Sequence, residues 1–138
     1  MNARIRILVA VFALFAVLVA PPCGRATAQG GKAEPARVRF PRGKTGTVLK
    51  GQLRADWQAE YAIVANQNQT MTFRLDDTPP GSLTLQVMDP DGADLPLTSD
   101  GKRQWHVALP KTGEYQFWVK RTSGKPGVSR YALAVTIR

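Results

Sequence analysis

The stretch 70–75, which is TMTFRL, alternates strictly between polar and apolar side chains and decides the fold class. In an extended strand this alternation places Met71, Phe73 and Leu75 on one face and the polar residues on the other. Short stretches with the same pattern recur through the chain, separated by turn residues at intervals of about ten positions, as in antiparallel all-β domains. The predicted strands span 38–40, 47–53, 60–65, 70–75, 83–87, 104–109, 114–120 and 131–137.

Turn residues set the limits of these strands. Residues 76–81 (DDTPPG) are predicted to form a loop, because two adjacent prolines do not fit a central strand. Residues 89–92 (DPDG) predict a tight turn, since proline suits its second position and glycine its last. Each strand has one apolar face that must be buried against another sheet. We therefore expect an all-β fold, an antiparallel, jelly-roll-like β-sandwich of about eight strands.

The N-terminal segment has the layout of a secretory signal peptide. Arg4 and Arg6 precede an apolar run over 7–20, which two prolines end, and 26–28 is a small-x-small cleavage signal. A helix over 7–20 would be about 21 Å long, short of the roughly 30 Å needed to span a membrane. We expect a signal peptide over 1–28 with cleavage near Ala28, a flexible leader over 29–37, a β-sandwich domain over 38–138, and a periplasmic or secreted location.

Charge and cysteine content restrict the partners. The formal net charge is +9, and removal of Arg4, Arg6 and Arg25 with the signal peptide leaves about +6. Outside the cytoplasm such a chain favours anionic envelope partners or an acidic protein cleft, and nucleic acid is not expected. The single cysteine, Cys23, lies in the signal segment, so the mature chain has no disulfide. Lipidation at Cys23 is the alternative to cleavage near Ala28.

Few residues point to metal or catalytic chemistry. Asp89, Asp91 and Asp94 place three carboxylates within six residues, a weak candidate for calcium, although a turn already explains the stretch. His106 is the only histidine and has no zinc-ligand spacing around it. We expect no cofactor and no enzymatic activity.

Two tryptophans are candidates for contact with a partner. Trp57 falls in a predicted loop over 54–59, and Trp118 falls on the outward side of its strand. An exposed aromatic side chain often marks an interface or a surface on which a sugar ring stacks. The alternative is that a neighbouring loop covers each ring.

Several segments carry a resemblance to known families. The chain resembles the periplasmic inhibitors of g-type (goose-type) lysozyme over residues 38–138, and it is also similar to the pre-peptidase C-terminal domain of secreted enzymes. The residues that carry the first resemblance are Val38, Arg39, Phe40, Gly43, Gly51, Tyr61, Ala65, Gln69, the stretch 109–115 (LPKTGEY) and the final strand over 131–137. The turn at 89–92 and the stretch 109–115 carry the second.

The resemblance to the inhibitors implies that loops plug the lysozyme cleft around its catalytic acid. The associated Ser-Gly-x-Tyr motif would fall on Thr112, Gly113 and Tyr115, with threonine in place of serine. The positive hairpin of the inhibitors corresponds here to a shorter one with Lys120, Arg121, Lys125 and Arg130.

Each of these groups also has a structural interpretation. Gly113 would supply a positive φ in a turn, Tyr115 would belong to the core, and the basic hairpin would be a solvated loop. The resemblance to the pre-peptidase domain implies instead a module that binds cell-wall glycan or protein through Trp57 and Trp118. Both hypotheses make the protein a binding protein, with g-type lysozyme or a cell-wall glycan as its partner.

Overall fold

The computed structural model describes residues 34–54, 57–122 and 127–138, and all regular structure in these ranges is β. The predicted signal peptide, Cys23 and Lys125 lie outside the described residues. The strands are β1 (Ala36–Arg37), β2 (Gly46–Arg54), β3 (Gln58–Ala65), β4 (Thr70–Thr78), β5 (Leu83–Met88), β6 (Asp94–Leu95), β7 (Thr98–Ser99), β8 (Gln104–Ala108), β9 (Gly113–Arg121) and β10 (Val128–Ile137). The described ranges contain no helix, and so none that could cross a membrane.

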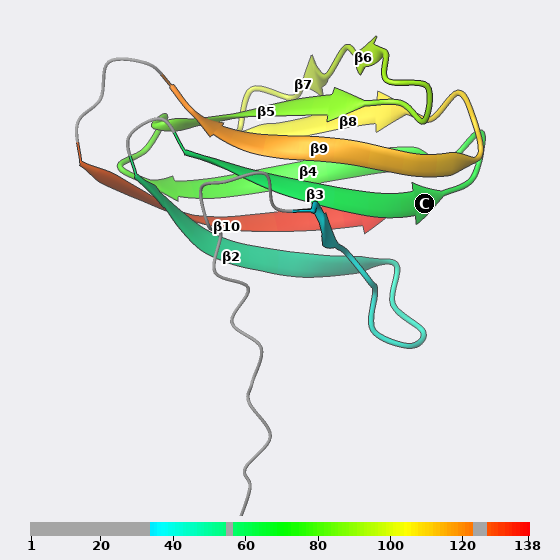
Figure 1. The fold of residues 1–138 in the computed structure, drawn as a ribbon, viewed down its shortest axis with the longest axis horizontal. Helices are drawn as coiled ribbons and strands as arrows, with labels where there is room; N and C mark the ends of the chain where they lie inside the picture. The colour runs from blue at the N-terminus through cyan, green and yellow to red at the C-terminus, as the bar shows by residue number, and fades with distance from the viewer. Residues whose placement is uncertain (1–33, 55–56, 123–126) are drawn as a thin grey trace, which may run out of the picture.

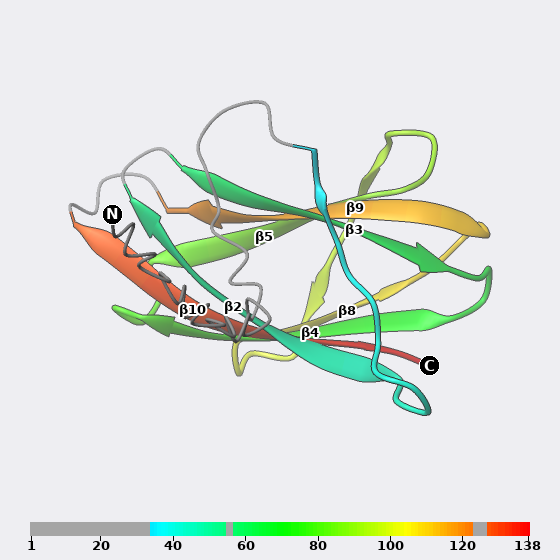
Figure 2. The same cartoon turned by 60° about the horizontal axis from the view of Figure 1, so that its bottom comes forward.

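The strands form two five-stranded sheets that pack face to face (Figures 1 and 2). One sheet has the order β1-β3-β9-β5-β6 and the other the order β2-β10-β4-β8-β7. All pairs are antiparallel except β1 with β3. Every connection between consecutive long strands crosses from one sheet to the other, as in a jelly roll. The predicted sandwich is confirmed.

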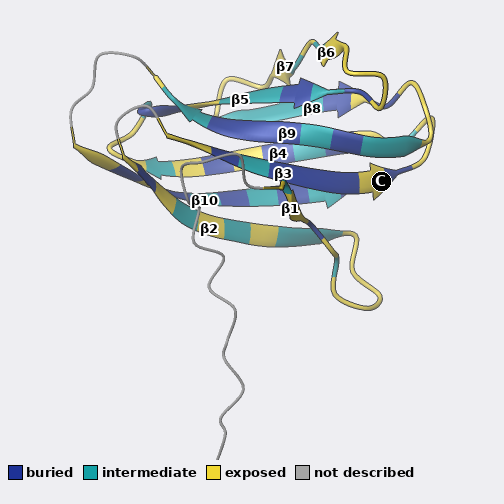
Figure 3. Ribbon diagram, viewed as in Figure 1, coloured by how far each residue is buried: buried dark blue, intermediate teal, exposed yellow. Residues whose placement is uncertain are grey.

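The core lies between the sheets, where the predicted apolar faces meet (Figure 3). Phe117 is at its centre: its ring stacks on Tyr61 and meets Phe73 of the opposite sheet edge to face, with both centroid distances 5.2 Å. The largest fully buried side chains are Tyr115, Phe73, Phe117, Leu53, Met71, Leu75, Leu83, Leu109, Leu133, Val87, Val119 and Val135. These side chains form one hydrophobic cluster that joins the two sheets.

A pair of tyrosines joins the sheets at one edge of this core. The hydroxyl groups of Tyr61 on β3 and Tyr131 on β10 form a 2.6 Å hydrogen bond. The Tyr131 ring lies across Gly51 of β2, where a Cβ atom would be 2.6 Å from the tyrosine oxygen. Glycine is therefore required at position 51 by close packing in the middle of a strand.

The structure corrects four local predictions. The sandwich begins earlier than residue 38, because Ala36–Arg37 at the end of the predicted leader pairs with β3, and 38–40 continues from it outside regular strand. The loop predicted over 76–81 starts later, because β4 extends to Thr78 through pairing with β10. The two-residue strands β6 and β7 were not predicted.

Candidate functional site

The predicted contact residues divide between the two ends of the sandwich. Strand β9 runs the length of the domain, with Gly113 at its start and Arg121 at its end (Figure 1). At about 3.3 Å per residue, these two positions are about 26 Å apart. Thr112, Gly113 and Tyr115 thus belong to one end, whereas Lys120, Arg121 and Arg130 belong to the other. The candidate contact residues therefore do not lie on one continuous surface.

At the first end, Tyr115 fixes the loop that precedes β9. Its ring is fully buried, and its hydroxyl donates to the carbonyl of Lys111 (2.6 Å) and accepts from the amide of Lys111 (3.1 Å). Both backbone groups of one loop residue are thereby satisfied by one side chain. Tyr115 has no exposed surface to offer to a partner, and its role here is to shape the loop.

Thr112 and Gly113 connect that loop to two others. The Thr112 hydroxyl accepts a hydrogen bond from the amide of Gln67 in the β3–β4 turn (2.9 Å). A Cβ atom on Gly113 would lie 2.7 Å from Cγ of Pro90 in the β5–β6 turn. Gly113 is absent from the residues with positive φ, so the prediction of a left-handed turn there is wrong. Its missing side chain instead makes room for Pro90.

The three carboxylates considered for calcium form hydrogen bonds and ion pairs with groups of the protein itself. Asp89 accepts from the amides of Asp91 (2.9 Å) and Ala93 (2.8 Å), and Lys111 pairs with both Asp89 and Asp91. Asp94 accepts instead from the side-chain amide of Gln86. Within the described ranges no three metal-ligating side chains gather.

The pKa values at this end follow from the same contacts. The Ala93 amide, with the Asp91 amide and Lys111, lowers the pKa of Asp89 below its usual value despite opposing desolvation. The hydrogen bond to Asp91 is the largest factor that raises the pKa of Lys111. Lys111 is thus paired with two carboxylates of the same end.

The second end of the sandwich carries several basic residues and one exposed aromatic ring. We call this surface the basic end and define it as Arg54, Trp57, Lys120, Arg121 and Arg130. Trp57 is 41% exposed, and its amide donates to the carbonyl of Arg54 at the end of β2 (2.9 Å). Arg121 donates to the carbonyl of Gly127, and Lys120 donates to the side-chain oxygen of Gln86.

Trp118 does not join Trp57 in an exposed aromatic surface. It lies on the outer face of its sheet, as predicted, but it is only 9% exposed. Its neighbours across the strands are Glu60 and Gln86, and the Lys120 ammonium is 5.7 Å from its ring centroid. A ring with so little exposed surface is a poor platform for sugar stacking.

His106 has a surface role. Its Nδ1 atom is 3.2 Å from a carboxylate oxygen of Asp100, and both side chains are 42% exposed. The pair lies between β8 and the loop after β7, where it is open to solvent.

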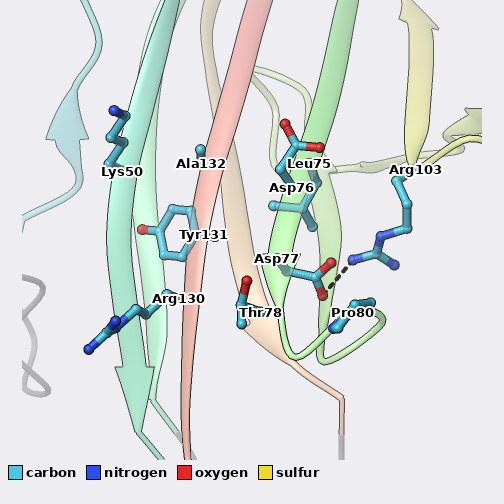
Figure 4. A pocket seen from close by; sticks show the side chains of 10 residues that line it. All are labelled: Lys50, Leu75, Asp76, Asp77, Thr78, Pro80, Arg103, Arg130, Tyr131 and Ala132. Carbon is cyan, nitrogen blue, oxygen red and sulfur yellow. Dashed lines mark ion pairs between the residues drawn. The ribbon is translucent and has the colours of Figure 1, made fainter.

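The outer face of the sheet formed by β2, β10 and β4 has an open hollow of about 550 Å³ (Figure 4). Residues of this face alternate with core residues along each strand, so Lys50, Asp76 and Arg130 point away from the core. The hollow is lined by Lys50, Leu75, Asp76, Asp77, Thr78, Pro80, Arg103, Arg130, Tyr131 and Ala132. Of these lining residues, only Arg130 was a candidate from the sequence. The hollow itself could not be predicted, because strand register brings its residues together.

Comparison with solved structures gives this geometry a context. The structure of Aeromonas hydrophila PliG, a periplasmic lysozyme inhibitor of g-type lysozyme, matches with a TM-score of 0.67 and 27% sequence identity, over 75% of this chain and 96% of PliG. The chain has the fold of these inhibitors. Salmonella Typhimurium PliG matches with a TM-score of 0.61 and 21% identity, over 77% of this chain and 99% of that one.

A third PliG structure, of a mutant from Escherichia coli, matches with a TM-score of 0.60 and 20% identity, over 75% of this chain and 97% of that one. No protein-family model and no curated protein sequence matches this chain significantly. The resemblance to the inhibitors that the sequence suggested is confirmed at the level of structure. The similarity to the pre-peptidase C-terminal domain stays a prediction.

Proposed function

We propose that this protein is a periplasmic or secreted inhibitor of g-type lysozyme that acts by binding and has no enzymatic activity. The observation that carries the proposal is the match to Aeromonas hydrophila PliG, which spans 96% of that inhibitor at 27% identity. An inhibitor that blocks a cleft needs only a rigid framework that presents a few side chains, and a sandwich with loops at its ends provides one.

The basic end is the surface that we propose for contact with the lysozyme. An acidic cleft is matched by cations, and desolvated hydrogen bonds between charged groups are stronger than exposed ones. Arg121 and Arg130 would supply the charge, and Trp57 would supply exposed apolar area. At the opposite end, Lys111 is already paired with Asp89 and Asp91, which leaves less charge for a partner.

The alternative, a glycan-binding module, has less support. That hypothesis relied on Trp57 and Trp118 as two stacking surfaces, and Trp118 is buried. Trp57 alone could contact a sugar ring, but it would do so without the second ring that the hypothesis requires.

The test is a titration of the processed protein, purified from the periplasm, against g-type lysozyme during digestion of peptidoglycan. Chicken-type lysozyme serves as the control enzyme. We expect stoichiometric inhibition of the g-type enzyme and none of the chicken-type enzyme. Undiminished digestion by the g-type enzyme at a molar excess of the protein would leave a likeness of fold without a shared activity.

A further inference from the structure

The hollow on the outer face of β2, β10 and β4 holds two opposite charges at a fixed separation. Ala132 of β10 pairs with Lys50 of β2 on one side and with Asp76 of β4 on the other. Because neighbouring strands lie about 4.8 Å apart, the Cα atoms of Lys50 and Asp76 are roughly 10 Å apart. Both side chains are exposed, and no ion pair of the described residues joins them.

A second cation and a hydroxyl group flank this row. Arg130 lies two residues before Ala132 and pairs with Thr78, and both of these side chains are exposed. Figure 4 shows Lys50 and Arg130 on one side of the hollow and Asp76 on the other, with Ala132 between them. The small Ala132 side chain leaves the floor of the hollow low.

The other carboxylate of the hollow is already used within the protein. The Asp77 side chain is 2% exposed and accepts from Arg103 (2.8 Å) and from the amide of Leu83 (3.0 Å). The Asp77 carboxylate is therefore not available to a ligand in the hollow. Asp76 is the carboxylate that remains open to a ligand.

We propose that this hollow binds a short peptide that carries both free carboxylates and a free amino group, the composition of a peptidoglycan stem peptide. Lys50 and Arg130 receive its carboxylates, Asp76 receives its ammonium group, and the peptide chain lies over Ala132. A volume of about 550 Å³ suits a ligand of two or three residues.

The negative charge of Asp76 favours a ligand of mixed charge over a purely anionic ligand. A phosphate group or an acidic polymer would gain from Lys50 and Arg130 but would be repelled by a carboxylate in the same row. A ligand of mixed charge satisfies all three side chains. The proposal does not depend on lysozyme inhibition, since the binding is measured without the enzyme.

The experiment is a calorimetric and NMR titration of the processed protein with the tripeptide L-Ala-γ-D-Glu-meso-diaminopimelate. We expect saturable binding, with amide shifts confined to β2, β4 and β10 around Ala132. Lys50→Met and Asp76→Asn should each weaken the affinity at least tenfold. Ala132→Leu should abolish binding without a change in charge, because the new side chain fills the floor.

Arg74→Ala is the matched control. Arg74 is an exposed cation on the same face, it pairs with Ala134, and it does not line the hollow. Its loss should leave the affinity unchanged, and circular dichroism should show that every variant is folded. The proposal is overturned by an absence of saturation, by equal affinities for the parent and Lys50→Met proteins, or by equal binding of the tripeptide with its amino groups acetylated.

Discussion

The hydroxyl oxygens of Tyr61 and Tyr131 lie 2.6 Å apart and connect the two sheets of the sandwich through one buried hydrogen bond. Tyr61 belongs to β3 and Tyr131 to β10, 70 positions apart in the chain. Burial is the main factor that raises the pKa of each phenol above its usual value of 10.0. The folded protein therefore keeps both protons at a pH where the unfolded chain loses them.

This difference predicts a loss of stability in alkali. Above about pH 10 the native state binds more protons than the unfolded state, so the free energy of unfolding falls as the pH rises. Urea unfolding at pH 8 and at pH 11 measures the fall. The double variant Tyr61→Phe/Tyr131→Phe should show a smaller fall than the parent protein, and an equal fall would contradict this assignment.

The same pair predicts an unusual order of stabilities at neutral pH. Tyr61→Phe alone leaves the Tyr131 hydroxyl buried without its partner, at a cost of about 1–3 kcal/mol. Replacement of both residues removes both polar groups and should cost less than the single change. Urea unfolding of the three proteins at pH 7 compares them directly, and a double variant less stable than Tyr61→Phe would contradict the prediction.

Gly51→Ala should destabilise the protein by about 1–3 kcal/mol, because the new methyl group would overlap the Tyr131 ring. The neighbouring variant Gln52→Ala points outward from the same strand and should change the stability by less than about 0.5 kcal/mol. Thermal unfolding measures both. A second change, Tyr131→Leu, should restore part of the loss caused by alanine, and strict additivity of the two changes would argue against the overlap.

Asp89 predicts a loss of stability in acid. Its pKa is lowered in the folded state, chiefly by the Ala93 amide, so its contribution is present above the unfolded pKa of 3.8. That contribution disappears as the pH falls through the lower folded value. Asp89→Asn should therefore show a smaller loss of thermal stability between pH 5 and pH 2 than the parent protein. Asp94→Asn is the control, because Asp94 accepts an exposed hydrogen bond from the Gln86 side chain and not from the backbone amides that hold Asp89.

The division of the predicted contact residues between the two ends gives a test of the inhibitory surface. Arg121→Ala/Arg130→Ala should weaken inhibition of g-type lysozyme at least tenfold and reduce its dependence on salt, because the charges that face the cleft are removed. Thr112→Ala at the opposite end should leave inhibition unchanged. The reverse result would place the contact on the loop before β9.

Local pattern was sufficient to predict much of the fold. The alternation around Phe73, Phe117 and Leu133 identified the buried faces, because a strand repeats every two residues and the alternation is visible in the sequence. Strands β6 and β7 have two residues each and so contain no pattern to detect. Arg37 was assigned to the leader because its pairing with β3 depends on a partner distant in the chain.

The candidate site was less predictable because it depends on topology. Thr112 and Arg121 are close in sequence, yet a fully extended strand between them carries them to opposite ends of the domain. Trp118 was correctly placed on an outer face, but the sequence does not show which side chains cover that face. Lys50 and Asp76 gave no signal, because only the register with Ala132 brings them into one row.

Strand β2 is the long outer edge of its sheet, and this position has a consequence for solubility. An edge of nine residues presents backbone groups that a second molecule could pair with, which is a common route to aggregation. Val48 on this edge is 55% exposed, whereas Lys50 and Arg54 place charges along the same outer face. Two molecules that approach edge to edge would bring these like charges together. The positive charge of β2 thus disfavours edge-to-edge pairing of two molecules of this protein.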